Sequence, residues 1–291
     1  MESITADIRR GLAWVLAPLG AAMLVRLALE PGYLTAPFGL LFALLAAFGA
    51  THLWLAGKSA PWRIRAALLL NFVAINVGYL AIGRAMNSHA GWRADDWVYA
   101  IDRALFGGDP QRFLARCSTP WLSTATMAGY LGFAGFLFYL FLSEGFVLQH
   151  ATGRVQLGLM RLYGIGFSGY ILLPAAGPVF HHPQLLAPIR HSAFSAALQP
   201  WVLGNCTRVD VCPSIHAAVC AFTLIWTYQR SRWLFWCLLP VGAALLLGTV
   251  YLQYHYVLDL PFGLLLGTVA ALSVSHVKSR SSLHGSSGAT R

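Results

Sequence analysis

Charged residues are scarce in this sequence of 291 residues. Asp, Glu, Lys and Arg make up only 10% of the chain, whereas a soluble globular domain carries about 25%. Hydrophobic residues make up 57%, and the mean hydropathy is +0.62. This composition excludes an ordinary water-soluble domain and predicts an integral membrane protein, with the bilayer as its surroundings.

Blocks of basic residues are absent as well, although the net charge is +10. Lys and Arg stand singly between apolar runs, without the clustering and aromatic interleaving of a nucleic-acid-binding surface. We therefore expect no nucleic-acid partner. The positive excess instead indicates how the chain is oriented in a membrane.

Cysteines are few, and the five present are too widely spread for a disulfide scaffold. Cys220 and Cys237 lie inside apolar runs and are expected to pack as small core residues. Cys206 and Cys212 flank a short polar loop, and a disulfide between them is predicted if that loop lies outside the cytoplasm. Cys117 remains an alternative partner.

Long apolar runs dominate what the sequence does contain. A membrane-spanning helix needs about 20 predominantly apolar residues. Eight runs approach this length, which predicts an all-α, polytopic membrane protein with eight transmembrane helices. The runs cover residues 11–29, 37–56, 66–83, 120–142, 157–176, 213–229, 233–252 and 256–276.

Basic residues occur in every second connection between these runs. By the positive-inside rule, this alternation places both termini in the cytoplasm and the other connections outside. The outer connection 84–119 agrees with this rule only in part. It contains five arginines, which the rule expects on the cytoplasmic side, together with aspartates, which count little in the rule. The cytoplasmic basic residues are Arg9, Arg10, Lys58, Arg63, Arg65, Arg154, Arg230, Arg232, Lys278 and Arg280.

Three further segments lie outside the apolar runs. Residues 96–106 repeat apolar side chains every three to four positions and predict an interfacial helix. The proline-containing connection 177–212 predicts an ordered lid. Residues 277–291 show no apolar period and predict a disordered cytoplasmic tail.

Two polar motifs border the apolar hairpin from Cys212 to Leu260. The first reads Cys-Pro-Ser-Ile-His at 212–216, and the second reads Tyr-His-Tyr-Val-Leu-Asp at 254–259. An out-and-back pair of helices brings both motifs to the same, extracytoplasmic face. His255 and Asp259 are four residues apart, so on a helix they share one side.

These residues provide the groups for phosphoryl transfer through a phosphohistidine. Asp259 on one ring nitrogen of His255 fixes the tautomer and leaves the other lone pair free to attack. His216 can protonate a leaving group, while Ser214 and the N–H groups of the helix that starts at Pro213 bind an anion. No metal or cofactor is needed. A zinc site formed by both histidines and Asp259 remains an alternative, without a tight ligand-spacing motif.

The paired motifs resemble those of the phosphatidic acid phosphatase type 2 superfamily, over roughly residues 65–276. The branch that contains inositol phosphorylceramide synthases is more similar still, because it shares a bulky residue at Ile215 and stretches like those at 102–110, 172–178 and 249–259. The resemblance implies a six-helix catalytic core at 65–276, preceded by two added helices in 1–64. It also implies His255 as nucleophile, His216 as general acid and Asp259 as the residue that orients His255.

The sequence departs from the phosphatase members of that superfamily. Their Lys-x6-Arg-Pro motif is missing, and Gly248-Thr249 occupies the place of their Ser-Arg pair. Such cations neutralise a phosphomonoester dianion. Their absence favours a singly charged phosphodiester, or a cation recruited from the lid, either Arg190 or Arg208. Ser214, Ile215 and Thr249 are the other expected substrate contacts.

The function that follows is transfer or hydrolysis of a lipid phosphate ester. Water as acceptor makes a lipid phosphate phosphohydrolase, whereas an alcohol makes a headgroup transferase, for example of phosphoinositol to a lipid acceptor. The missing cations favour the transferase. Two non-enzymatic alternatives stay open, a transporter with proton-sensing histidines and a structural membrane protein. We expect a bacterial inner-membrane protein with its site on the extracytoplasmic face.

Overall fold

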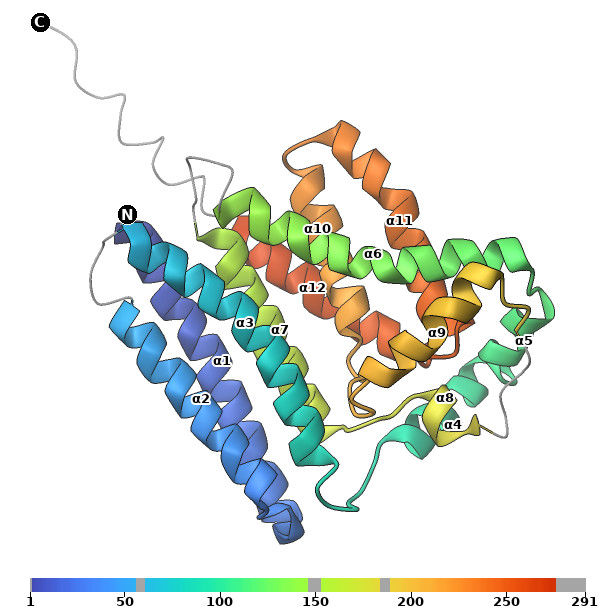
Figure 1. Ribbon diagram of the computed structural model, residues 1–291, viewed down its shortest axis with the longest axis horizontal. Coiled ribbons are helices and arrows are strands. Elements are labelled where there is room, and N and C mark those ends of the chain that lie inside the picture. Colours follow the sequence, from blue (N-terminus) through green and yellow to red (C-terminus); the bar gives the residue numbers. More distant parts are fainter. Residues whose placement is uncertain (1, 56–60, 146–152, 184–188, 276–291) are drawn as a thin grey trace, which may run out of the picture.

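The computed structural model describes residues 2–55, 61–145, 153–183 and 189–275, and helices packed side by side make up this part of the chain (Figure 1). It contains no strand apart from one isolated bridge between Ala175 and Asp210, so the predicted all-α class is confirmed. The tail predicted to be disordered lies outside the described residues. The helices are α1 (Glu2–Leu29), η1 (Pro31–Tyr33), α2 (Ala36–Leu55), α3 (Pro61–Met86), α4 (Asp95–Phe106), α5 (Pro110–Arg116), α6 (Pro120–Gly145), α7 (Arg154–Leu172), α8 (Pro178–His181), α9 (Ala193–Asn205), α10 (Ile215–Tyr228), α11 (Arg232–Tyr251) and α12 (Asp259–Ser275).

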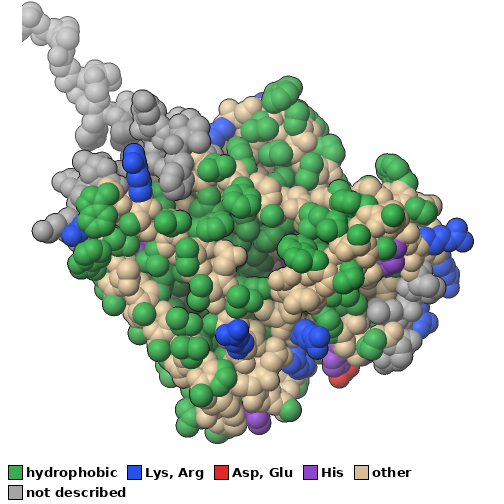
Figure 2. All heavy atoms as spheres, viewed as in Figure 1, with side chains coloured by type: hydrophobic (Ala, Val, Ile, Leu, Met, Phe, Trp, Pro, Cys, Tyr) green, Lys and Arg blue, Asp and Glu red, His purple; other side chains and the backbone are tan. Residues whose placement is uncertain are grey.

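Five helices in the described part are long and apolar enough to cross a membrane: α1, α2, α3, α6 and α11. Their outer surfaces carry large apolar side chains, and Trp121 and Trp233 are each 75% exposed. Hydrophobic side chains are scattered over much of the face shown in Figure 2. Such a surface is costly in water but is solvated by lipid tails, so the helices belong to an integral membrane protein.

Three of the eight predicted spans do not meet the same criterion. With 14 and 17 residues, α10 and α12 are about 21 and 26 Å long, which is less than the hydrocarbon core of roughly 30 Å. The third, α7, is buried along most of its length and packs against α1, α3 and α12. Because it contacts protein rather than lipid, it tolerates polar residues such as Gln156 and Ser168. Eight transmembrane helices are therefore not confirmed.

The helices form two groups that meet at α7 and α12. In the first group, α1 packs along α7 and α2 packs against α3 (Figure 1). In the second, α6 packs against α11, and α10 lies between α11 and α12. One continuous apolar core runs from Met23 of α1 to Ala271 of α12. The short helices α4, α5, α8 and α9 gather at one end of the second group, where α6 begins and α11 ends.

Glycines set the distance between α10 and α12. A Cβ atom on Gly263 would collide with the backbone of Ser214, and one on Gly267 would collide with the backbone of Ala218. The two helices therefore pack with their backbones in contact. This close approach brings the start of α12, at Asp259, beside the start of α10.

An apolar cavity of about 270 Å³ lies among α1, α2, α3 and α7. Its lining includes Leu41, Ile75 and Phe167 together with the amides of Asn71 and Gln156. None of the motif histidines borders it, so the site described next is a separate place in the molecule.

Candidate active site

The first motif forms the beginning of α10. Ser214 is the N-cap residue, and its hydroxyl accepts a hydrogen bond from Ala217 N at 3.3 Å. Its own backbone N–H donates to the carbonyl oxygen of Asp259, also at 3.3 Å. His216 follows in the first turn, where free N–H groups and the helix dipole favour an anion. The first motif is thus joined directly to the second.

The second motif is a tight loop between α11 and α12 and not a helical turn. Gln253 adopts a left-handed backbone conformation with φ of 64°, which turns the chain sharply after α11. The N–H groups of Tyr254 and His255 then both donate to the carbonyl oxygen of Thr249, at 3.0 and 2.9 Å. His255 is only 3% exposed as a result, and its ring is directed toward α10.

The rings of His216 and His255 contact each other. His255 Nε2 lies 3.2 Å from His216 Nδ1, while His255 Nδ1 lies 3.5 Å from a carboxylate oxygen of Asp259. The same oxygen accepts a hydrogen bond from Tyr256 N at 3.0 Å. A proton on His255 Nδ1, the nitrogen that faces the carboxylate, leaves the lone pair on Nε2, and in that tautomer His216 Nδ1–H is the donor between the rings.

Aromatic rings hold the His216 imidazole in place. Tyr130 is stacked on it with ring centroids 4.8 Å apart, and Phe133 lies against it at 4.5 Å. Tyr130 also contacts Tyr254, so the aromatic group extends to the second motif. This packing orients the ring and excludes water from that side.

Helix α4 anchors the loop that carries His255. The buried carboxylate of Asp102 accepts hydrogen bonds from Val257 N at 2.7 Å and Leu258 N at 2.9 Å. Burial raises the pKa of Asp102, whereas these two N–H groups and the amide of Gln111 act in the opposite direction. Gln111 Nε2 also donates to the carbonyl oxygen of His255 at 3.4 Å.

A second buried carboxylate, Asp95, supports the other side of this loop. It accepts hydrogen bonds from Ala176 N and Gly177 N at 2.9 Å and from the Tyr256 hydroxyl at 3.0 Å. Neither carboxylate is among the functional residues that the sequence predicts. Their seven-residue spacing, which places Asp95 and Asp102 on one side of a helix, was the available signal.

The residues predicted to contact substrate do not gather at one point of the structure. Ile215 is buried, and its side chain lies against Gly166, while the Thr249 hydroxyl donates to Leu246 O at 2.7 Å. Arg208 lies over the Phe180 ring, with its guanidinium carbon 4.8 Å from the centroid. Arg190 is exposed, and its backbone N–H donates to the Ser118 hydroxyl at 3.2 Å. Within the described ranges, no contact joins either arginine to His216 or His255.

The predicted disulfide between Cys206 and Cys212 is not formed, because both are free cysteines. Cys206 ends α9, and its thiol donates to Val202 O at 3.3 Å, while burial raises its pKa to about 12. The buried Cys212 thiol lies near the carboxylate of Asp259 instead, and burial together with that negative charge raises its pKa. Each thiol thus has a different partner, and Cys117 is free too.

A further group of possible metal ligands lies nearby. Among the described residues, Asp96, His181 and His182 bring three donor atoms within 4.8 Å of one another. The motif residues His216 and His255 do not form such a group, so the alternative of zinc at the paired motifs gains no support.

The fold and the two facing histidines define an integral membrane protein with a paired-histidine site at the ends of short helices. Comparison with protein-family models finds a match to the PAP2 superfamily over residues 96–273, which includes both motifs and most of α4 to α12. The chain therefore belongs to the PAP2 superfamily, and its activity is of the lipid phosphatase type. No significant match was found among curated proteins or solved structures.

Proposed function

We propose that this protein is a metal-independent phosphotransferase that acts on lipid phosphate esters through a phosphohistidine at His255. The observation that carries this proposal is the arrangement of three side chains in line, with Asp259 at Nδ1 of His255 and His216 at Nε2. The carboxylate fixes the tautomer of the nucleophile, and the second imidazole lies on the side where the phosphorus must enter.

In the first step, His255 Nε2 attacks phosphorus and forms the P–N bond. The P–O bond to the leaving group breaks, and His216 transfers its Nδ1 proton to the departing alkoxide. Asp259 stabilises the positive charge that develops on the His255 ring, as a buried carboxylate does for an imidazolium.

In the second step, His216 is the base. Its Nδ1 accepts the proton of an acceptor hydroxyl, whose oxygen attacks phosphorus while the P–N bond breaks. A lipid or headgroup alcohol as acceptor completes a transfer, as in the inositol phosphorylceramide synthase-like branch, for example of phosphoinositol to a lipid acceptor. Water as acceptor gives the second candidate, a lipid phosphate phosphohydrolase.

The binding groups favour a phosphodiester. The first turn of α10 offers backbone N–H groups and the Ser214 hydroxyl for one negative charge. Ile215 and Thr249 stay the other predicted substrate contacts. Arg190 and Arg208 stay the predicted sources of a cation, and movement of the lid would be needed to bring either one to the phosphate.

The membrane arrangement that we propose follows from the basic connections. Residues 1–64 provide two additional membrane helices, and residues 65–276 form the catalytic core. Both termini lie in the cytoplasm of a bacterial inner membrane, and the histidines lie at the extracytoplasmic face. A short α10 and α12 then place the reaction near the depth at which lipid headgroups meet the hydrocarbon region.

Purified protein offered lipid phosphomonoesters and phosphodiesters, with and without alcohol acceptors, tests the proposal. We expect new lipid to form from a phosphodiester and an alcohol, together with a phosphoenzyme that is stable to base and labile to acid. His255→Ala should remove both, while its melting temperature in detergent remains close to that of the wild type. Turnover by a well-folded His255→Ala protein would contradict the proposed nucleophile, and complete absence of turnover would favour a transporter or a structural protein.

A further inference from the structure

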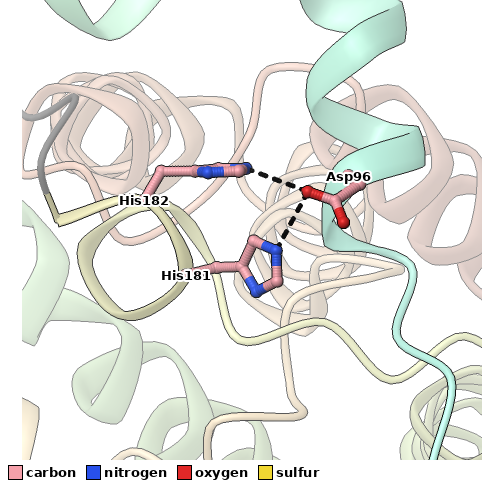
Figure 3. A group of neighbouring side chains, drawn as sticks. All are labelled: Asp96, His181 and His182. Carbon is pink, nitrogen blue, oxygen red and sulfur yellow. Dashed lines mark hydrogen bonds and ion pairs between the residues drawn. The ribbon is translucent and has the colours of Figure 1, made fainter.

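A group of one carboxylate and two imidazoles lies on the outer side of α4 and α8. Asp96 belongs to the first turn of α4, and His181 and His182 lie at the end of α8, more than 80 residues later in the chain. Figure 3 shows both rings directed toward the same oxygen of Asp96. His181 Nε2 is 3.1 Å from this oxygen, and His182 Nε2 is 3.7 Å from it.

The His181 ring is oriented from behind by a second carboxylate. Its Nδ1 lies 3.7 Å from Asp95, which is fully buried and held by two backbone N–H groups and the Tyr256 hydroxyl. When a cation replaces the proton between His181 Nε2 and Asp96, the carboxylate of Asp95 favours the remaining proton on Nδ1, which leaves the lone pair of Nε2 for the cation. This is the arrangement in which histidines bind metals, where the remote ring nitrogen donates to a carboxylate.

The His182 ring is held by packing. It lies against Tyr99 with ring centroids 4.4 Å apart and meets the His181 ring edge-on at 4.5 Å. Its Nε2 atom is buried and has no hydrogen-bond partner among the described residues. A buried ring nitrogen without a partner costs free energy, which a bound cation at that nitrogen offsets.

We propose that Asp96, His181 and His182 bind one divalent transition-metal cation of the zinc type, with water completing the coordination. Two imidazoles and one carboxylate are a ligand set that zinc prefers. In a tetrahedral site with bonds of about 2.0–2.1 Å, neighbouring ligand atoms are roughly 3.3 Å apart. The two distances to Asp96, 3.1 and 3.7 Å, bracket that separation. Asp96 is 83% exposed, so a cation reaches the site from solvent.

Through its ligands the bound cation would link α8 to α4 and so stabilise the position of Asp95. Asp95 in turn binds the Tyr256 hydroxyl, directly after His255, so the site supports the catalytic loop from outside. The three ligands contact neither His216 nor His255, and the cation takes no part in the bond changes proposed above. Binding therefore stands or falls independently of the phosphotransferase activity.

Metal binding to the full chain in detergent tests this proposal. The protein carries no polyhistidine tag, is stripped with EDTA and is titrated with Zn²⁺ by calorimetry, and Co²⁺ absorption reports the coordination geometry. We expect one Zn²⁺ per chain, with a Kd weakened about tenfold or more in Asp96→Asn, His181→Gln and His182→Gln. Zn²⁺ should raise the melting temperature of the wild type but not that of these variants.

His191→Gln is the matched control, since His191 lies in the same lid but outside the group. It should bind Zn²⁺ as the wild type does. Absence of stoichiometric binding to the wild type overturns the proposal, as does equal binding by the variants. Each variant is first shown to be monodisperse, and Asp96→Asn, which changes an exposed side chain, keeps the test valid if a histidine variant fails to fold.

Discussion

His255 Nε2 lies 3.2 Å from His216 Nδ1, so the nucleophile and the acid that we propose contact each other before any substrate arrives. In-line attack needs the phosphorus and its leaving oxygen between them, which requires the two nitrogens to separate to roughly 6 Å. The resting hydrogen bond between the two rings is therefore replaced when a phosphate enters.

The proton donated by His216 gives a prediction about leaving groups. With an alkyl phosphodiester, His216→Ala should lower the rate of phosphoenzyme formation by about 10²–10⁴-fold, because the alkoxide then leaves without a proton. With a p-nitrophenyl phosphodiester, whose leaving group needs no proton, the loss should be less than about tenfold. The pre-steady-state rate of phosphoenzyme formation with both substrates measures this without the second step, in which His216 is the base, and equal losses would contradict the role of general acid.

The anchoring of the catalytic loop predicts a selective effect for Asp102→Asn. The asparagine amide accepts only one of the two loop N–H groups and presents a donor to the other. His255 should then be misplaced, with kcat and the rate of phosphoenzyme formation lower by about 10–100-fold and KM changed little. Asp109→Asn, which removes a carboxylate that pairs with exposed Arg103 and Arg112, should keep both rates. A change in KM alone for Asp102→Asn would argue against positioning.

The crossing of α10 and α12 predicts that Gly267→Ala is destabilising. Its methyl group would meet the backbone of Ala218, and forcing the helices apart costs about 1–3 kcal/mol. Gly135→Ala in α6 has no neighbour within 4 Å and should be neutral or stabilising by about 0.5–1 kcal/mol. Unfolding in detergent compares the two, and similar effects would rule out this close packing as the cause.

The partly buried imidazole of His191, in the lid, leads us to expect a loss of stability in acid. Its Nδ1 lies 3.2 Å from the Ser195 hydroxyl and 3.5 Å from that of Ser123, and burial lowers its pKa. The unfolded chain, with a pKa of about 6.5, then binds more protons than the folded chain, so the free energy of unfolding decreases as pH falls through that value. Melting temperatures from pH 7.5 to 5 should show a shallower slope for His191→Gln, and an unchanged slope would exclude this contribution.

The separate partners of the thiols predict how many cysteines react with an alkylating reagent. All five cysteines should react with an alkylating reagent in the unfolded protein without prior reduction. Peptide mapping by mass spectrometry reads this directly. A cross-linked peptide that contains Cys206 and Cys212 would show that the two thiols leave their separate partners.

The sequence by itself determined the membrane character, the helical class and the pairing of His255 with Asp259. Apolar composition and length act locally, and residues four apart are near each other in any compact turn. The contact forms although His255 lies in a loop and not on a helix, because Asp259 caps that loop through Tyr256 N. The number of membrane-spanning helices could not be predicted from composition in the same way. Helix α7 is buried in protein, so its residues do not indicate whether it contacts lipid.

Only the tertiary structure decided which distant segments meet. Asp102 reaches the loop after His255, Cys212 reaches Asp259 rather than Cys206, and Asp96 reaches His181. Each contact joins positions far apart in the chain, and it depends on how closely helices approach one another. Periodicity within a helix shows which side is polar, but the close packing at Gly263 and Gly267 and the buried N–H groups decide what that side binds.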